Sequence, residues 1–168
     1  ASGDPENQIL GDLMVGLYTE DVNGSPILGA ADKVTTSPDG LTWTFSIRNH
    51  KWSDGKPVTA EDFVYSYRRI LSPKIASEYA SILYPIKNAE LVNTGKLPIE
   101  QLGVSAPNAK TFVIQLAHPA PYLPEMMTHY STFAIPKHVV EKNGFNWVKP
   151  GTMASNGPYM LAARRPND

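Results

Sequence analysis

The 168-residue chain contains no cysteine, and none of its apolar runs is long. Without cysteine there can be no disulfide framework and no zinc site built on thiolates. The apolar runs all fall short of the ~20 residues that a membrane-spanning helix needs. Neither charge dominates, because 15 Lys and Arg stand against 16 Asp and Glu. The sequence therefore lacks the basic excess typical of nucleic-acid binding, and we expect neither that partner nor direct membrane insertion.

Residues with catalytic or metal-binding chemistry are also scarce. The four histidines match no metal-binding spacing; they are His50, His118, His129 and His138. The segment 53–56 satisfies the letters of a Ser-x-x-Lys nucleophile motif, but it stands in a turn and its companion motifs are missing. The segment 153–157 lacks the first glycine of a nucleophile elbow. We therefore expect no catalytic residue, no metal site and no cofactor.

Proline, by contrast, is abundant. Fifteen prolines in 168 residues are nearly twice the ~5% that is typical of proteins. This composition predicts many short elements joined by fixed turns. The length suits one core, and the sequence shows no internal repeat and no flexible linker. We expect a single domain over residues 1–168.

The clearest local pattern is a strand, a turn and a helix in succession. From Leu41 to Ile47, apolar side chains alternate with threonine and serine, which is the period of a strand with one buried face. After a turn at Asp54-Gly55, Thr59 is a suitable N-cap for a helix that ends before Pro73. The apolar residues of the strand, Trp43, Phe45 and Ile47, are predicted to be buried against the helix face that carries Phe63 and Tyr67.

Weaker patterns predict further short elements. Helices are expected at about 5–17, 75–84, 86–92, 122–128 and 136–142. Strands are expected at 17–19, 25–31, 31–37, 104–106, 110–116 and 157–163. Turn residues between consecutive strands make the pairing antiparallel. The fold class is therefore α+β, with small, mostly antiparallel sheets and several short helices.

The aromatic residues allow two interpretations. Those near the strand and helix could form a stacking platform for sugars or bases; they are Trp43, Trp52, Phe63, Tyr65 and Tyr67. Without a basic groove, aromatic residues are more often part of the core. The core interpretation is preferred, and a glycan-binding module remains an alternative.

Two long segments carry a family resemblance. Residues 37–45 read SPDGLTWTF and residues 51–66 read KWSDGKPVTAEDFVYS. Together they resemble the signature of the family 5 extracellular solute-binding proteins of ABC importers. Shorter segments are similar to the oligopeptide-binding branch of that family; they are 77–81, 101–104, 111–116, 121–122 and 156–159.

The resemblance implies a domain organisation. The chain resembles the accessory domain of a cluster C periplasmic binding protein, so residues 1–168 would form one accessory-type domain. Residues 1–12 and 157–168 would be short flanks from the first lobe. The second lobe would be absent from this chain.

The resemblance also implies a function and candidate contacts. The implied protein is the substrate-binding component of a peptide importer, and it is not an enzyme. Its partners would be an oligopeptide ligand and an inner-membrane ABC permease. Candidate peptide contacts are Ser2, Gly3, Asp4 and Tyr79. We expect a monomer located in the periplasm, or lipid-anchored and extracellular in a Gram-positive host.

Two other functions stay open at this point. One is a fragment of an enzyme whose catalytic residues lie elsewhere, and the other is the glycan-binding module described above. Without the second lobe, the isolated chain is expected to bind peptide only weakly.

Overall fold

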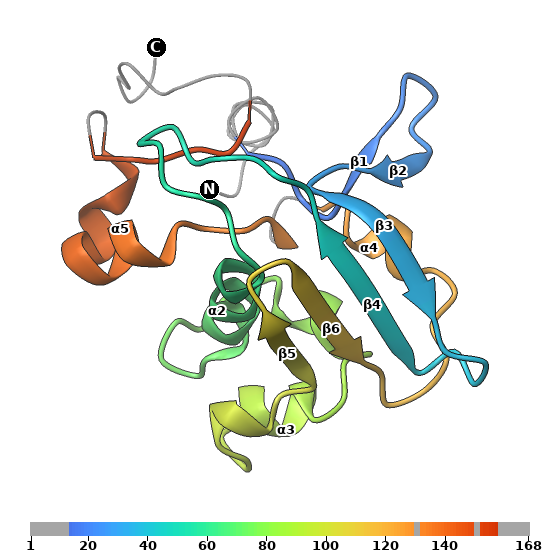
Figure 1. Ribbon diagram of the computed structural model, residues 1–168. Helices are drawn as coiled ribbons and strands as arrows, with labels where there is room; N and C mark the ends of the chain where they lie inside the picture. Colours follow the sequence, from blue (N-terminus) through green and yellow to red (C-terminus); the bar gives the residue numbers. More distant parts are fainter. Residues whose placement is uncertain (1–13, 130–131, 150–151, 158–168) are drawn as a thin grey trace.

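The computed structural model describes residues 14–129, 132–149 and 152–157. Figure 1 shows a four-stranded sheet with helices against it and a small two-stranded sheet beside one end of it. Every strand pair in both sheets is antiparallel. This architecture confirms the predicted α+β class.

The main sheet consists of two hairpins that lie side by side. In one hairpin β3 (Ala31–Thr36) pairs with β4 (Thr42–Ile47), and in the other β5 (Val104–Asn108) pairs with β6 (Thr111–Gln115). The strand order is β3-β4-β6-β5, with Phe45 of β4 opposite Phe112 of β6. Both hairpins agree with the sequence pattern. The two hairpins form one sheet because β4 pairs with β6. This pairing joins segments that are distant in the sequence, so no local sequence pattern predicts it.

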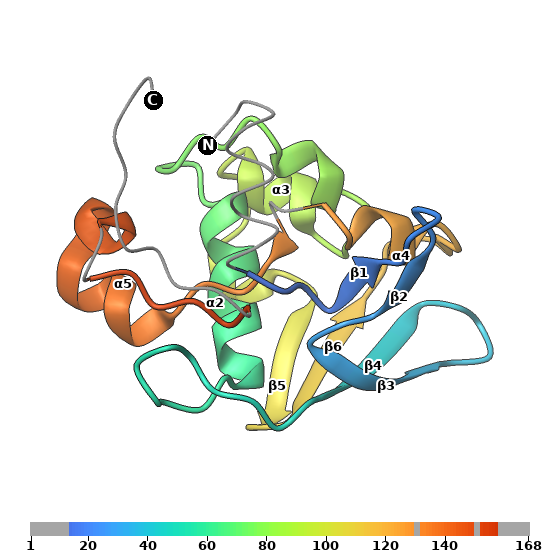
Figure 2. The ribbon, with the colours of Figure 1, turned by 90° about the horizontal axis from the view of Figure 1, so that it is seen from above.

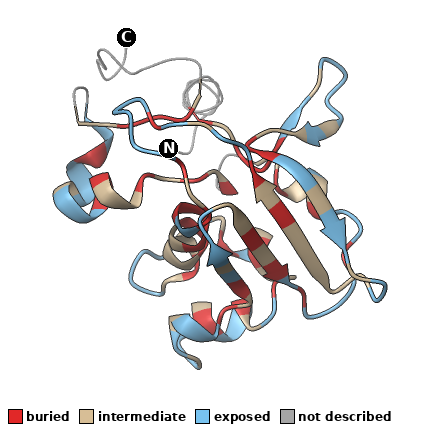
Figure 3. Ribbon diagram, in the orientation of Figure 1, coloured by how far each residue is buried: buried red, intermediate tan, exposed pale blue. Residues whose placement is uncertain are grey.

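One face of this sheet carries the core. Helix α2 (Ala60–Leu71) packs on β5 and β6, as Figure 2 shows, and buried residues fill the layer between helix and sheet (Figure 3). The Phe112 ring lies 5.7 Å from Phe63, 5.3 Å from Tyr67 and 6.3 Å from Phe45, measured between ring centroids. All four of these side chains are fully buried. The predicted burial of Phe45 is confirmed, and Phe112 links its ring to those of α2.

Trp43 departs from the prediction. Its side chain is only partly buried, although it stacks on Phe45 at 6.4 Å. Its indole N–H donates a hydrogen bond to the Gly40 carbonyl at 3.3 Å. Because α2 covers β5 and β6, the Trp43 end of β4 receives less cover than the alternation alone suggests.

The first turn of α2 is capped as the sequence predicts. The Asp62 carboxylate accepts the Thr59 backbone N–H at 3.0 Å, which forms one half of a capping box. The same carboxylate accepts the Trp52 indole N–H at 3.1 Å and the Lys137 backbone N–H at 3.3 Å. Asp62 is buried. One carboxylate therefore joins the helix, the preceding turn and a distant part of the chain.

The other helices in the described part of the chain are short. They are η1 (Ala80–Leu83), α3 (Ala89–Asn93), η2 (Ile99–Gln101), α4 (Leu123–Met126), α5 (Lys137–Asn143) and η4 (Gly144–Val148). The helices expected at 75–84 and 86–92 are therefore wrong in extent. Ala76 and Asn88 have φ of 48° and 64°, and such left-handed residues do not lie within a right-handed helix.

The N-terminal part of the described chain also differs from expectation. Residues 14–17 are not helical, so the helix expected at 5–17 is wrong there, and its remainder lies outside the described residues. The Val15 backbone bonds to the Asn156 side chain, and the Gly16 carbonyl accepts the Ala30 N–H. These tertiary bonds occupy groups that a helix would use. In the following hairpin, β1 (Tyr18–Glu20) pairs with β2 (Pro26–Leu28), which confirms the antiparallel pairing expected of the segments 17–19 and 25–31.

Candidate functional site

Tyr79, the candidate contact that the structure describes, lies in the loop before η1. Its backbone N–H donates to the Ser77 hydroxyl at 3.3 Å, and the loop contains the left-handed residue Ala76. The Tyr79 ring is half-buried and packs against the His129 ring, with 5.1 Å between centroids and 49° between planes. We call this ring pair the Tyr79–His129 wall. The other candidates, Ser2, Gly3 and Asp4, lie outside the described residues.

His129 is held by the loop that follows α4. Its carbonyl accepts the backbone N–H of Thr132 at 3.0 Å and the Thr132 hydroxyl at 2.8 Å. The Thr132 hydroxyl also donates to the Met127 carbonyl at 3.1 Å, and Thr132 is fully buried. Burial lowers the pKa of His129, so its imidazole is neutral near pH 7. The wall therefore presents two polar but uncharged aromatic rings.

The lowered pKa of His129 predicts a pH dependence of stability. The folded chain binds fewer protons than the unfolded chain once the pH falls below ~6.5, the ordinary value for histidine. The free energy of unfolding should therefore decrease as the pH falls through that range. His129→Gln should remove this part of the decrease. Urea denaturation between about pH 7.5 and 5 measures it, and His118→Gln, at an exposed imidazole, is the control. A pH dependence unchanged in His129→Gln would contradict the prediction.

Sequence reasoning did not identify His129 as a site residue. The histidine stands in no motif, and it meets Tyr79 only because the loop after α4 folds back toward the loop before η1. A contact between two loops has no periodic signal. The sequence showed only that a histidine stands in a segment rich in aromatic and polar residues, which does not by itself indicate a binding site.

A second group of polar contacts joins residues near the two ends of the described part of the chain. The Asn156 side-chain oxygen accepts the Val15 N–H at 2.9 Å, and the Asn156 side-chain nitrogen donates to the Val15 carbonyl at 2.9 Å. Next to it, Ser53 N–H donates to the Ser155 carbonyl at 2.7 Å, and Ser155 N–H donates to the Ser53 hydroxyl at 3.0 Å. Segments 14–16, 50–53 and 153–156 are thus joined side by side. We call the Asn156–Val15 pair the crossing clamp.

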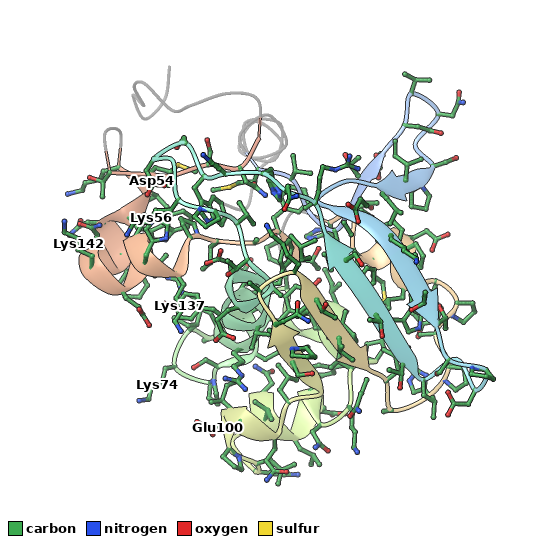
Figure 4. All side chains as sticks on the ribbon, viewed as in Figure 1. Asp54, Lys56, Lys74, Glu100, Lys137 and Lys142 are labelled. Atoms are coloured by element: carbon green, nitrogen blue, oxygen red, sulfur yellow. The ribbon has the colours of Figure 1, made fainter. Side chains whose placement is uncertain are left out.

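A third polar group surrounds α5. His138 Nε2 lies 2.5 Å from the Asp54 carboxylate, and Lys137 lies 3.6 Å from Glu61. Figure 4 labels Asp54, Lys56 and Lys137 in the region of α5. Partial burial raises the pKa of Asp54, but the hydrogen bonds from His138 and from the Lys56 N–H outweigh it, so the pKa is lowered. Lys56, Glu61, Lys137 and His138 line a hollow of about 290 Å³, together with Pro57, Thr59, Asp62 and Glu141. Its lining holds lysines and carboxylates in similar number, so the hollow offers little unbalanced charge to a ligand.

The structure also bears on the alternative chemistries. Trp52, Phe63 and Tyr67 are buried, so these three rings are not available for stacking on a sugar. The segment 53–56 forms a turn and 153–157 forms a loop, as expected. Within residues 14–129, 132–149 and 152–157, no cluster of histidine and carboxylate side chains could hold a metal ion. The helices of that same part are all too short or too polar to cross a membrane.

Comparison with protein families and sequences gives consistent matches. A family described as bacterial extracellular solute-binding proteins, family 5 Middle, matches residues 25–168. The periplasmic oligopeptide-binding protein OppA of Salmonella typhimurium is 44% identical over 162 residues, which are 95% of this chain and 30% of OppA. The periplasmic murein peptide-binding protein MppA of Escherichia coli is 41% identical over 171 residues, which cover 100% of this chain and 32% of MppA.

Solved structures agree with these matches. Haemophilus influenzae OppA in complex with the peptide RPPGFSPFR is 41% identical, with a TM-score of 0.94 over 98% of this chain and 33% of that one. The substrate-binding domain of an oligopeptide ABC transporter from Bacillus anthracis is 40% identical, with a TM-score of 0.92 over 96% of this chain and 32% of that one. The chain thus spans about a third of the length of these relatives.

Proposed function

Since this chain belongs to the bacterial extracellular solute-binding proteins of family 5, we propose that it is part of the substrate-binding component of a peptide ABC importer. The whole protein captures extended oligopeptides and delivers them to an inner-membrane permease. The observation that carries this proposal is the identity of about 40% to oligopeptide- and murein-peptide-binding proteins, over nearly the entire chain.

The proposal assigns the chain to one side of a two-lobed cleft. Residues 1–168 are the accessory domain, with 1–12 and 157–168 as flanks from the first lobe, and the second lobe comes from the rest of the polypeptide. An extended peptide lies in the cleft like an added strand, held through its backbone. Closure of the lobes excludes water from the peptide.

The Tyr79–His129 wall supplies a ring surface for this cleft, and Ser2, Gly3 and Asp4 supply backbone contacts. The wall can contact peptide side chains of different chemistry, because its ring faces are apolar and its ring edges are polar. Its neutral imidazole can accept or donate a hydrogen bond without selecting a charged residue. No step requires covalent chemistry, so the protein is a binding protein and not an enzyme.

The relatives named above as periplasmic support a periplasmic location. In a Gram-positive host the equivalent protein would be lipid-anchored and extracellular. A monomer suffices, because both walls of the cleft come from one polypeptide.

Calorimetry with tri- to pentapeptides tests the proposal. The full-length polypeptide should bind, whereas the 168-residue chain should show no affinity tighter than about millimolar, a free energy of ~4 kcal/mol. Tyr79→Ala in the full-length protein should weaken binding about five- to tenfold, because one ring contact is lost while backbone bonds stay. Tyr122→Ala, at an exposed tyrosine, is the matched control.

The results can also refute the proposal. Absence of peptide binding by the full-length protein would refute the function. Micromolar binding by the 168-residue chain would refute the division of the cleft between two lobes. Peptide hydrolysis would favour the enzyme alternative, and retention on a glycan array would favour the glycan-binding one.

A further inference from the structure

The crossing clamp joins two segments that are far apart in the sequence. Asn156 meets both backbone groups of Val15 at 2.9 Å, the pattern by which one residue of a strand pairs with another. Asn156 is only 9% exposed, and its side-chain nitrogen also lies 3.4 Å from His50 Nε2. Two partly buried bonds to one residue fix the position of Val15 more closely than a single bond could.

Contacts lead from this clamp toward the Tyr79–His129 wall. Gly16, next to Val15, lies so close to the segment after α4 that an added Cβ would be 2.6 Å from the Phe133 ring and 3.1 Å from the Met127 carbonyl. That carbonyl accepts the Thr132 hydroxyl, which also donates to the His129 carbonyl. The backbone that Asn156 fixes is therefore packed directly under the loop that carries His129.

We propose that Asn156 is a positioning residue for peptide binding, which sets the Tyr79–His129 wall through Val15 and Gly16. Asn156 touches no part of the wall itself in the described contacts, so it acts through the backbone that it holds. The proposal rests on the proposed peptide-binding function. It adds that the segment around Asn156 and the Tyr79–His129 wall are mechanically connected.

Peptide affinity of the full-length protein provides the first test, well below the melting temperature of every variant. Asn156→Ala should weaken binding about fivefold. In a Tyr79→Ala background the same substitution should weaken it less than about twofold further, because the wall on which Asn156 acts is already impaired. Gly16→Ala should behave in the same way. A purely structural role would lower the melting temperature without this loss of additivity.

Asn143→Ala is the matched control. Asn143 also donates its side-chain N–H to a backbone carbonyl, that of Val139, at 2.9 Å. It lies at the end of α5, outside the path from Val15 to His129. Asn143→Ala should lower stability modestly and leave peptide affinity unchanged.

A second test does not depend on peptide. In NMR spectra of the histidine-labelled 168-residue chain, the His129 ring signals should shift in Asn156→Ala and stay in place in Asn143→Ala. The ring current of Tyr79 makes these signals sensitive to the ring contact. The His129 signals are assigned by their loss in His129→Gln.

The outcomes separate the two proposals. An equal loss of affinity in both backgrounds, or His129 signals that do not move, would overturn the positioning role. If the full-length protein binds no peptide but the His129 signals shift, the function falls while the mechanical connection stands. If Asn156→Ala does not fold, Gly16→Ala decides by the same criteria.

Discussion

Phe112→Ala is expected to lower the free energy of unfolding by about 3–5 kcal/mol, the range for a fully buried phenylalanine. Phe112 has no exposed surface and is the side chain at which three other rings meet: Phe45 of β4, and Phe63 and Tyr67 of α2. Its removal loses apolar burial and leaves a cavity between β4, β6 and α2. Each lost edge or tilted ring contact adds to that cost.

Urea denaturation of the 168-residue chain measures this effect, and Phe145→Ala is the control. Phe145 is 80% exposed, and the Arg69 guanidinium lies 5.9 Å from the centre of its ring. Its replacement should change stability by less than about 1 kcal/mol. Equal urea midpoints for the two variants would show that the aromatic cluster is not the core of this fold.

The sequence predicted those parts of the fold that depend on local patterns. Alternation placed Phe45 and Ile47 inside, and Thr59 correctly marked the start of α2. Both hairpins of the main sheet followed from turn residues between alternating runs. These features depend on residues that are close together in the sequence, so they can be predicted from a single sequence.

The missed features depend on distant partners. The pairing of β4 with β6 determines how far helix α2 extends over β4. As a result, Trp43 of β4 is left partly exposed. Residues 14–17 have an apolar spacing that suits a helix, but the bond from Val15 to Asn156 spans 141 positions and overrides it. Likewise, Tyr79 meets His129 between two loops. Tertiary contacts of this kind outweigh propensities of a few tenths of a kcal/mol per residue.

The candidate site divides in the same way. Family resemblance pointed to Tyr79, and the structure gives Tyr79 a ring neighbour that the resemblance did not supply. The choice of Ser2, Gly3 and Asp4 stays a prediction. Residue spacing in the sequence predicts neither the place of His129 in the site nor the role proposed for Asn156, because both depend on tertiary contacts.

Asp62→Ala should lower the free energy of unfolding by about 3 kcal/mol, because it leaves buried donors without an acceptor. The Asp62 carboxylate accepts N–H groups from Trp52, Thr59 and Lys137. These donors come from the turn before α2, the cap of α2 and the start of α5. All three would lose their bond at once, and a methyl group cannot replace any of them.

Asp62→Asn should cost less than the alanine variant, because the amide keeps one acceptor oxygen but turns a donor toward the other N–H groups. Asp21→Ala is the matched control, since Asp21 also accepts two backbone N–H groups, those of Asn23 and Ser25, but in an exposed turn. There water replaces the lost acceptor, so the cost should stay below about 1 kcal/mol. Chemical denaturation of the three variants orders them. If Asp62→Ala were no more destabilising than Asp21→Ala, the buried carboxylate would not be what holds α2 and α5 together.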